Sequence, residues 1–172
     1  HSEVEVVSRQ VEDDTLHRYT YADAYRRAKQ LANALQRLGV TKGDRIATLA
    51  WNTFRHLEAW YAITGQGAIC HTVNPRLFEQ QIEYIVNHAE DKVILVDITF
   101  VPLLEKLQAN LGSVEHFIVL TDEANMPETE LPNAICYESL IAEESDQFDW
   151  PCFPEDTAAG LCYTSGTTGD PK

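Results

Sequence analysis

Polar and apolar residues alternate with the period of a helix near the start of the chain. Between Tyr21 and Leu38, apolar residues recur every three or four positions, and Gly39 follows them. Thr20 and Asp23 stand at the spacing of a capping box, in which two side chains bond reciprocally to backbone N–H groups at a helix start. The periodicity, the cap and the terminal glycine predict one complete amphipathic helix.

Short apolar runs then alternate with helical spacing along the rest of the chain. We predict buried strands at 46–50, 68–73, 93–96, 117–120 and 159–163, and helices at 53–66, 82–89 and 100–111. Turns are expected at 42–44 and at Asn74 and Pro75. Continuous apolar strands separated by single helices favour a mostly parallel sheet with helices on both faces and right-handed crossovers. The predicted fold class is a doubly wound α/β domain.

The segment before the last predicted strand has a different composition. From Thr121 to Pro171 the chain contains no Lys or Arg, and its acids include Asp122, Glu123, Glu128, Glu130, Glu143, Glu144, Asp146 and Asp149. Runs of charge usually form solvated surface. We therefore predict a solvated acidic connection over about 121–155, with an exposed, mobile loop at 126–133.

Composition excludes several classes of function. A chain of 172 residues with 44% hydrophobic and 23% charged residues suits one buried domain, and no apolar run approaches the roughly 18 residues of a membrane span. The net charge of −14 disfavours nucleic acid and anionic membrane surfaces as partners. No signal-peptide pattern opens the chain, so we expect a cytoplasmic protein, with peripheral attachment to a membrane left open.

The cysteines and most histidines carry no recognisable site. The four cysteines, which form no close pair such as C-x-x-C, favour reduced, mostly buried thiols over a zinc or redox site: Cys70, Cys136, Cys152 and Cys162. His56 and His88 lie in predicted helices without a ligand-spaced partner, which favours surface or packing roles. We expect no metal site among these residues.

A second group of residues has both a structural and a functional interpretation. His71, Asn74 and Arg76 follow or end the second strand of the predicted sheet and could form a polar site, although a capped turn explains them without a substrate. Three aromatic residues are expected in the core or in an interface rather than as platforms for bases: Trp51, Trp60 and Tyr61.

The last twelve residues carry the most specific pattern. Gly166 and Gly169 allow the backbone to approach an anion closely, and Lys172 adds a compact positive charge. Four neighbouring hydroxyl groups can donate hydrogen bonds to phosphate oxygens: Thr164, Ser165, Thr167 and Thr168. Backbone N–H groups exposed in a turn form an anion site, and doubly wound sheets bind ligands beyond the carboxyl ends of their strands. The segment predicts a phosphate-binding loop at 164–172.

The order of residues in this loop distinguishes it from other glycine-rich segments. It is not a Walker A loop, because Asp170 and Pro171 separate the lysine from the second glycine. A flexible linker is the alternative that composition alone favours. The pattern Tyr-Thr-Ser-Gly-Thr-Thr-Gly-x-Pro-Lys resembles the signature loop of the adenylate-forming, AMP-binding enzyme family at every defined position. Asp170 occupies the variable position, where an acid beside a triphosphate is unexpected.

The resemblance extends over nearly the whole chain. The segment 19–43 is similar to the opening helix and turn of that family, and Gly67, Ala68 and Pro75 match a second short motif. The segments 51–58, 70–77 and 81–97 are most similar to fatty acyl-CoA synthetases of medium or long chain length. Ligases for aryl or short-chain acids share parts of these segments, so another carboxylate remains an alternative, as does a non-catalytic interaction module.

The resemblance implies a reaction and a set of ligands. A carboxylate attacks the α-phosphate of ATP to form acyl-AMP, and the thiol of coenzyme A then displaces AMP. Carried over by position, the residues that contact the β and γ phosphates are Thr164, Ser165, Gly166, Thr167, Thr168, Gly169 and Lys172. Thr164 or Ser165 is the candidate contact of Mg²⁺. Fatty acid and coenzyme A are the implied substrates, and a homodimer through the N-terminal region is the implied assembly.

The resemblance also implies that much of the enzyme lies outside this sequence. We expect residues 1–172 to form the N-terminal part of the AMP-binding domain, with the C-terminal domain absent. The resemblance places the adenine pocket, the acyl tunnel and a catalytic lysine beyond residue 172. No catalytic residue is therefore expected within the chain, which should be inactive alone.

Overall fold

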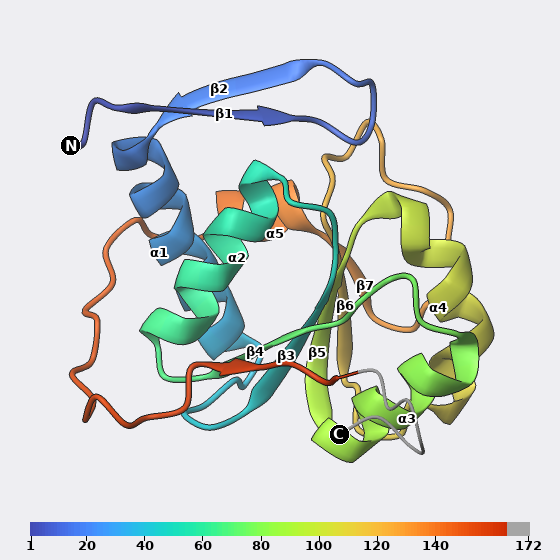
Figure 1. The fold of residues 1–172 in the computed structure, drawn as a ribbon. Helices are drawn as coiled ribbons and strands as arrows, with labels where there is room; N and C mark the ends of the chain where they lie inside the picture. Colours follow the sequence, from blue (N-terminus) through green and yellow to red (C-terminus); the bar gives the residue numbers. More distant parts are fainter. Residues whose placement is uncertain (165–172) are drawn as a thin grey trace.

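A parallel sheet forms the centre of the computed structural model, which describes residues 1–164 (Figure 1). Its strand order is β7-β6-β5-β3-β4-β8, and every neighbouring pair is parallel. The strands are β3 (Arg45–Leu49), β4 (Ile69–Thr72), β5 (Asp91–Val96), β6 (His116–Val119), β7 (Ala134–Cys136) and β8 (Gly160–Leu161). The predicted parallel α/β architecture is confirmed.

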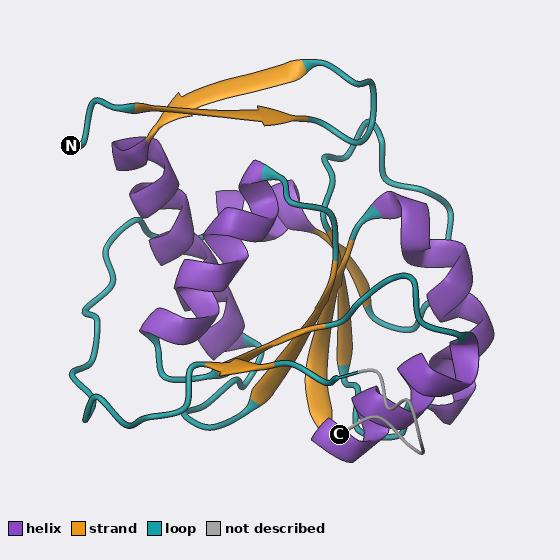
Figure 2. Ribbon diagram, viewed as in Figure 1, coloured by secondary structure: helices purple, strands orange, loops and turns teal. Residues whose placement is uncertain are grey.

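Helices cover both faces of this sheet (Figure 2). One face packs against α1 (Tyr21–Arg37), α2 (Phe54–Gly65) and α5 (Tyr137–Ala142), and the other against α3 (Glu79–Ala89) and α4 (Val101–Leu107). Successive strand residues point to opposite faces, so Ile46 joins the first core and Ala47 the second. Short 3₁₀ turns flank α4 at Ile98–Phe100 and Gln108–Asn110, which together account for the helix predicted at 100–111.

The predicted start of α1 is confirmed in atomic detail. Thr20 Oγ1 accepts a hydrogen bond from the Asp23 N–H at 3.2 Å, and Asp23 Oδ2 accepts one from the Thr20 N–H at 3.1 Å. These two bonds satisfy backbone donors that a helix start otherwise leaves unpaired. At the other end, Gly39 has a φ of +85°, the left-handed conformation that commonly ends a helix.

The direction of the crossovers creates a switch point at the end of β3. The chain leaves β3 for α2 on one face, whereas it leaves β4 and β5 for α3 and α4 on the opposite face. In doubly wound sheets the carboxyl ends of strands around such a point form the ligand-binding edge. Parallel pairing brings the end of β8 to the same edge beside β4.

An antiparallel hairpin at the N-terminus was not predicted. It consists of β1 (Glu5–Arg9) and β2 (Leu16–Thr20) and lies across the ends of α1 and α2 (Figure 1). Phe54, the first residue of α2, stacks on His17 with ring centroids 3.7 Å apart. Tertiary packing therefore supports strands whose own sequences are short and rich in polar residues.

The interpretation of 121–155 as a solvated connection is only partly right: most of its residues are exposed or half-buried, but the segment also contains folded elements. The segment contains β7, which extends the sheet, and α5, whose Tyr137 is completely buried. Leu131, in the predicted exposed loop 126–133, is also buried. The gain from burying these apolar side chains outweighs the acidic composition, because the acids lie outward or bind arginines.

Two predictions about exposure also need correction. The four cysteines are free thiols, as expected, but Cys152 and Cys162 are exposed, and only Cys70 is fully buried. Trp51, Trp60 and Tyr61 expose 42, 39 and 55% of their surface, so of the two predicted locations the core is excluded and an interface stays a prediction. No helix within residues 1–164 is both long enough and apolar enough to span a membrane.

Candidate functional site

The predicted phosphate loop begins at the carboxyl edge of the sheet. The last strand, β8, pairs with β4 through Gly160 and Leu161, and the chain then reaches Tyr163 and Thr164. Thr164, a candidate phosphate and Mg²⁺ contact, is exposed at this edge. The other predicted contacts lie outside the described residues: Ser165, Gly166, Thr167, Thr168, Gly169 and Lys172.

Tyr163 is held by histidines from two different elements. Its hydroxyl lies 2.6 Å from Nδ1 of His88, in the last turn of α3, and its ring centroid lies 5.1 Å from that of His71 in β4. Tyr84 stacks on His88 with ring centroids 5.4 Å apart. Burial and the nearby Asp91 carboxylate raise the pKa of Tyr163, so its hydroxyl stays protonated at neutral pH.

Below Tyr163 lies a buried histidine–carboxylate pair. His71 Nδ1 and Asp91 Oδ2 are 2.7 Å apart, and both side chains are fully buried. Burial raises the pKa of Asp91, and the contact with His71 opposes this rise. His71 Nε2 and Asp91 Oδ1 have no hydrogen-bond partner among the described residues. This pair links β4 to the first residue of β5 across the intervening strand β3.

The second candidate loop is a capped turn, as predicted. Asn74 Oδ1 accepts a hydrogen bond from the Arg76 N–H at 3.0 Å, which closes the turn after β4. His71 is not part of this turn, because it lies within the strand and is buried. Arg76 is exposed, and no carboxylate within residues 1–164 forms an ion pair with it.

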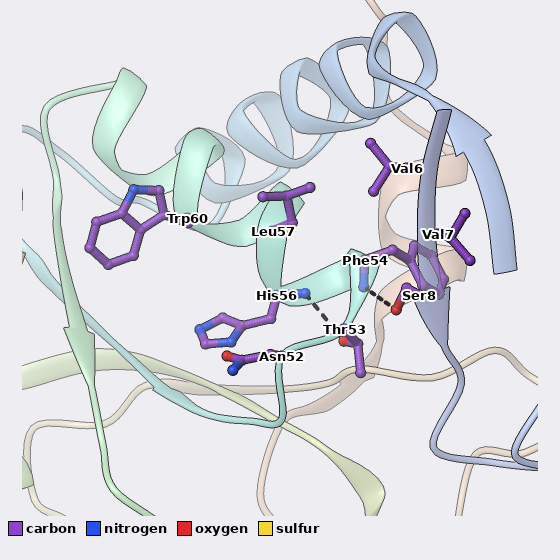
Figure 3. Close-up of a pocket in the computed structure, with 9 residues that line it drawn as sticks. All are labelled: Val6, Val7, Ser8, Asn52, Thr53, Phe54, His56, Leu57 and Trp60. Atoms are coloured by element: carbon purple, nitrogen blue, oxygen red, sulfur yellow. Dashed lines mark hydrogen bonds between the residues drawn. The ribbon is translucent and has the colours of Figure 1, made fainter. Parts of the chain in front are cut away.

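A pocket of about 390 Å³ lies beside the switch point, between β1 and the first turns of α2 (Figure 3). Its lining residues are Val6, Val7, Ser8, Asn52, Thr53, Phe54, His56, Leu57 and Trp60. Ser8 Oγ accepts a hydrogen bond from the Phe54 N–H at 3.0 Å, which ties the hairpin to α2. The only ionisable group among these lining residues is His56, and its Nε2 lies 3.0 Å from Thr48 Oγ1. The pocket therefore offers no pair of groups for acid–base chemistry.

A buried network of charged residues at this edge was missed in the sequence. Glu58 is fully buried, and its carboxylate binds Arg27 Nε at 2.8 Å and the Tyr137 hydroxyl at 2.6 Å. Glu138 accepts two hydrogen bonds of 2.9 Å from Arg27 and one of 2.8 Å from Arg55. Arg55 also contacts Glu12, in the turn of the hairpin, at 2.5 Å.

This network is structural rather than catalytic. Every charged group in it is paired, which is what burial of charge requires. Arg27 and Arg55 stabilise the charged form of Glu138 and so lower its pKa, although burial opposes this. Glu138 is one of many acids in the acidic segment, so its sequence position does not distinguish it. Only the apolar residues around it could have indicated that it lies in a buried network. No group of three or more metal-ligating side chains converges within residues 1–164.

Comparisons with known proteins agree with the fold and with the family that the sequence resembles. A model of the AMP-binding enzyme family matches residues 3–172. The medium-chain fatty acid–CoA ligase of Ectopseudomonas oleovorans is 45% identical over 172 residues, which are 100% of this chain and 31% of that protein. The long-chain fatty acid–CoA ligase of Thermus thermophilus is 49% identical over 168 residues, 98% of this chain and 29% of its own.

A solved structure shows the same arrangement of elements. An anthranilate CoA ligase in complex with anthranoyl-AMP superposes with a TM-score of 0.83 at 26% identity, over 90% of this chain and 29% of that structure. The chain thus spans about a third of the length of the relatives it matches.

Proposed function

Because the chain belongs to the AMP-binding enzyme family, we propose that it is the N-terminal part of a ligase that joins a fatty acid to coenzyme A at the expense of ATP. The observation that carries this proposal is the signature loop that follows β8. It follows β8, which pairs in parallel with β4 in a doubly wound sheet, and such sheets bind their ligands with loops that follow their strands. In this proposal the AMP-binding domain begins within residues 1–172, and a C-terminal domain follows elsewhere in the intact protein.

The proposed reaction has two halves. An oxygen of the substrate carboxylate attacks the α-phosphorus of ATP, the bond to the β-phosphate oxygen breaks, and pyrophosphate leaves. The sulfur of coenzyme A then attacks the acyl carbon of acyl-AMP, AMP leaves, and the thiol proton passes to solvent. The residues of this chain serve the first half by holding the triphosphate, which is catalysis by positioning and charge neutralisation.

Within the loop each residue type has a physical task. We assign contacts with the β and γ phosphates to Thr164, Ser165, Gly166, Thr167, Thr168 and Gly169, and the balancing charge to Lys172. Glycine suits a backbone that must approach phosphate closely, and hydroxyls can follow its oxygens. Mg²⁺, when bound with ATP, would neutralise part of the phosphate charge. Thr164 carries a hydroxyl, and Mg²⁺ is an ion that prefers oxygen ligands and retains its waters.

Two of the similar relatives support fatty acid as the substrate class. Two ligases that are 45 and 49% identical to this chain over the aligned residues are named for medium-chain and long-chain fatty acids. An aryl acid is the second candidate, because the similar solved structure is a ligase for anthranilate. A homodimer is part of the proposal, and the exposed Tyr61, Trp51 and Trp60 supply aromatic surface suited to an interface. A cytoplasmic location of the intact protein is likewise a proposal.

The test of this function is exchange of labelled pyrophosphate into ATP by the intact protein, with acids of increasing chain length and an aryl acid beside them. Exchange with a chain-length optimum is expected. Lys172→Ala should weaken exchange by raising the KM for ATP, and Gly166→Ala should do so more strongly, because a Cβ would obstruct close approach of phosphate. Lys106→Ala, on the exposed surface of α4, serves as a charge-matched control.

The same assay can reject the proposal. Exchange only with the aryl acid would replace fatty acid as the substrate class. No exchange with any acid would favour a non-catalytic module. Unchanged ATP binding by Gly166→Ala would show that the loop does not bind the phosphates.

A further inference from the structure

The strand that precedes the phosphate loop is short. Within residues 1–164, only Gly160 and Leu161 pair with β4 in the ladder, at one edge of the sheet. The ladder therefore ends before Tyr163, and backbone pairing does not extend to the residues where the loop begins. An edge strand of this length supplies few hydrogen bonds, so side-chain contacts must contribute to the placement of its end.

Tyr163 supplies such a contact. Its ring packs against the core between the sheet and the helix α3, where His71 lies 5.1 Å away. Its hydroxyl reaches across to His88 Nδ1 at 2.6 Å. The helix α3 is anchored on the sheet by buried Ile82, Ile85 and Val86, so His88 projects from a fixed support.

A neighbouring ring orients the imidazole of His88 for this contact. The ring of Tyr84, four residues earlier on α3, stacks on the imidazole with an interplanar angle of 24°. Residues four apart on a helix lie on the same face, which places the two rings together. The stack limits rotation of the imidazole and keeps Nδ1 directed at Tyr163. No acid or base within residues 1–164 forms an ion pair with His88.

We propose that His88 is a positioning residue for ATP: by binding the Tyr163 hydroxyl it fixes the backbone from which the loop 164–172 departs. The inference rests on the proposed function of that loop. A phosphate site built from backbone N–H groups loses affinity when its starting point moves, because several donors must meet the oxygens together. His88 touches no reacting atom and acts through Tyr163.

Kinetics of the intact protein provide the first test. His88→Ala and Tyr163→Phe should each raise the KM for ATP by about three- to tenfold, the effect of one lost hydrogen bond, and should leave kcat and the KM for the acid nearly unchanged. The double variant should be no worse than either single variant, because both remove the same bond. His88→Asn should recover most of the affinity, since its amide can occupy the position of Nδ1.

Amide hydrogen exchange of the segment 160–172 provides a second test that does not depend on the reaction. His88→Ala should accelerate exchange there, and His88→Asn should restore it. Asn87→Ala is the matched control: it removes a hydrogen bond of 2.9 Å from the same turn of α3 to the Asn110 carbonyl, away from Tyr163.

The two tests separate the inference from the proposed function. If no acid supports pyrophosphate exchange, the function fails, and hydrogen exchange still decides the role of His88. Unchanged protection of 160–172 in His88→Ala would overturn the inference, as would a fall in kcat with no change in the KM for ATP. An equal loss of protection in Asn87→Ala would reduce His88 to a general packing role.

Discussion

Asp97 shows how one buried carboxylate can link the strands at the ligand-binding edge. It follows β5 and accepts a hydrogen bond of 2.5 Å from the Trp51 N–H, just beyond β3. The side chain is almost completely buried, and burial raises its pKa from 3.8 to about 6, although the bond to Trp51 opposes the rise. The contact therefore holds two strand ends together but leaves a costly charge at neutral pH.

This cost should appear as a dependence of stability on pH. A raised pKa in the folded chain means that the folded state binds the Asp97 proton more tightly than the unfolded state does. The resulting stabilisation of the folded state is fully present below pH 3.8 and is lost as pH rises through about 6. At 1.36 kcal/mol per pKa unit the loss is about 3 kcal/mol. Asp97→Asn should remove this slope, so urea unfolding should show it gaining stability over the wild type between pH 4 and pH 7.

Asp156→Asn is the control for this comparison, because it removes one negative charge at an exposed site. Its stability should run parallel to that of the wild type over the same pH range. If Asp97→Asn also runs parallel to the wild type, then Asp97 is not a desolvated carboxylate in solution.

At the scale of elements, the arginine–glutamate network replaces apolar packing where helices and hairpin meet. Arg27 of α1 binds Glu58 of α2 and Glu138 of α5, which ties three helices on one face of the sheet. Burial raises the pKa of Glu58, and Arg27 and Tyr137 counteract this rise. Removing one partner would leave a charge buried without compensation.

Arg27→Met should therefore destabilise the chain by about 3–5 kcal/mol in urea unfolding. The loss should shrink as pH falls, because the unpaired Glu58 can then take up a proton. Arg26→Met is the matched control one residue earlier, where the arginine is half exposed beside Asp23. That change should cost less than about 1 kcal/mol. Equal losses in the two variants would contradict a specific role for the buried network.

Local patterns and long-range contacts explain which elements the sequence could predict. The helix α1 was predicted because its periodicity, its capping box and Gly39 all lie within one short segment. The network could not be predicted in this way, because Glu138 meets Arg55 and Arg27 across 83 and 111 positions of sequence. Composition also misled: the acids of the 121–155 segment concealed the apolar spacing of α5.

The candidate site likewise has one part that the sequence could predict and one part that it could not. The motif at its end identified the loop, since glycines, hydroxyls and lysine follow one another directly. The contact between His88 and Tyr163 joins residues 75 positions apart and left no sign in either local sequence. The motif thus predicts the chemistry of the loop, whereas the support of the loop depends on how α3 packs against the sheet.

At the scale of the whole molecule, the segment 143–157 returns the chain from one edge of the sheet to the other. It crosses the outer side of α1 and α2, where Asn33 donates hydrogen bonds to the carbonyls of Ser145 and Gln147. Trp150 then lies over Gly65 and Phe153 over Gly67, so both glycines leave room for aromatic rings. This segment delivers the chain to β8 and hence to the phosphate loop.

Alanine substitutions of three glycines can measure how tightly this returning segment is held. Gly67 has a φ of +86°, and a Cβ there would lie 2.5 Å from Phe153, so Gly67→Ala combines backbone strain with a clash and should cost about 2–4 kcal/mol. Gly39 has a similar φ but no close neighbour, so its replacement should cost about 1–2 kcal/mol. Gly112, with neither constraint, should change stability by less than about 0.5 kcal/mol.

The part of the loss due to the clash can be isolated by removing the ring. In a Phe153→Ala background, Gly67→Ala should cost no more than Gly39→Ala, because only backbone strain remains. Urea unfolding of the four variants and the double variant supplies the comparison. If Gly67→Ala costs the same with and without the Phe153 ring, the segment moves aside freely, and its path does not determine where β8 enters the sheet.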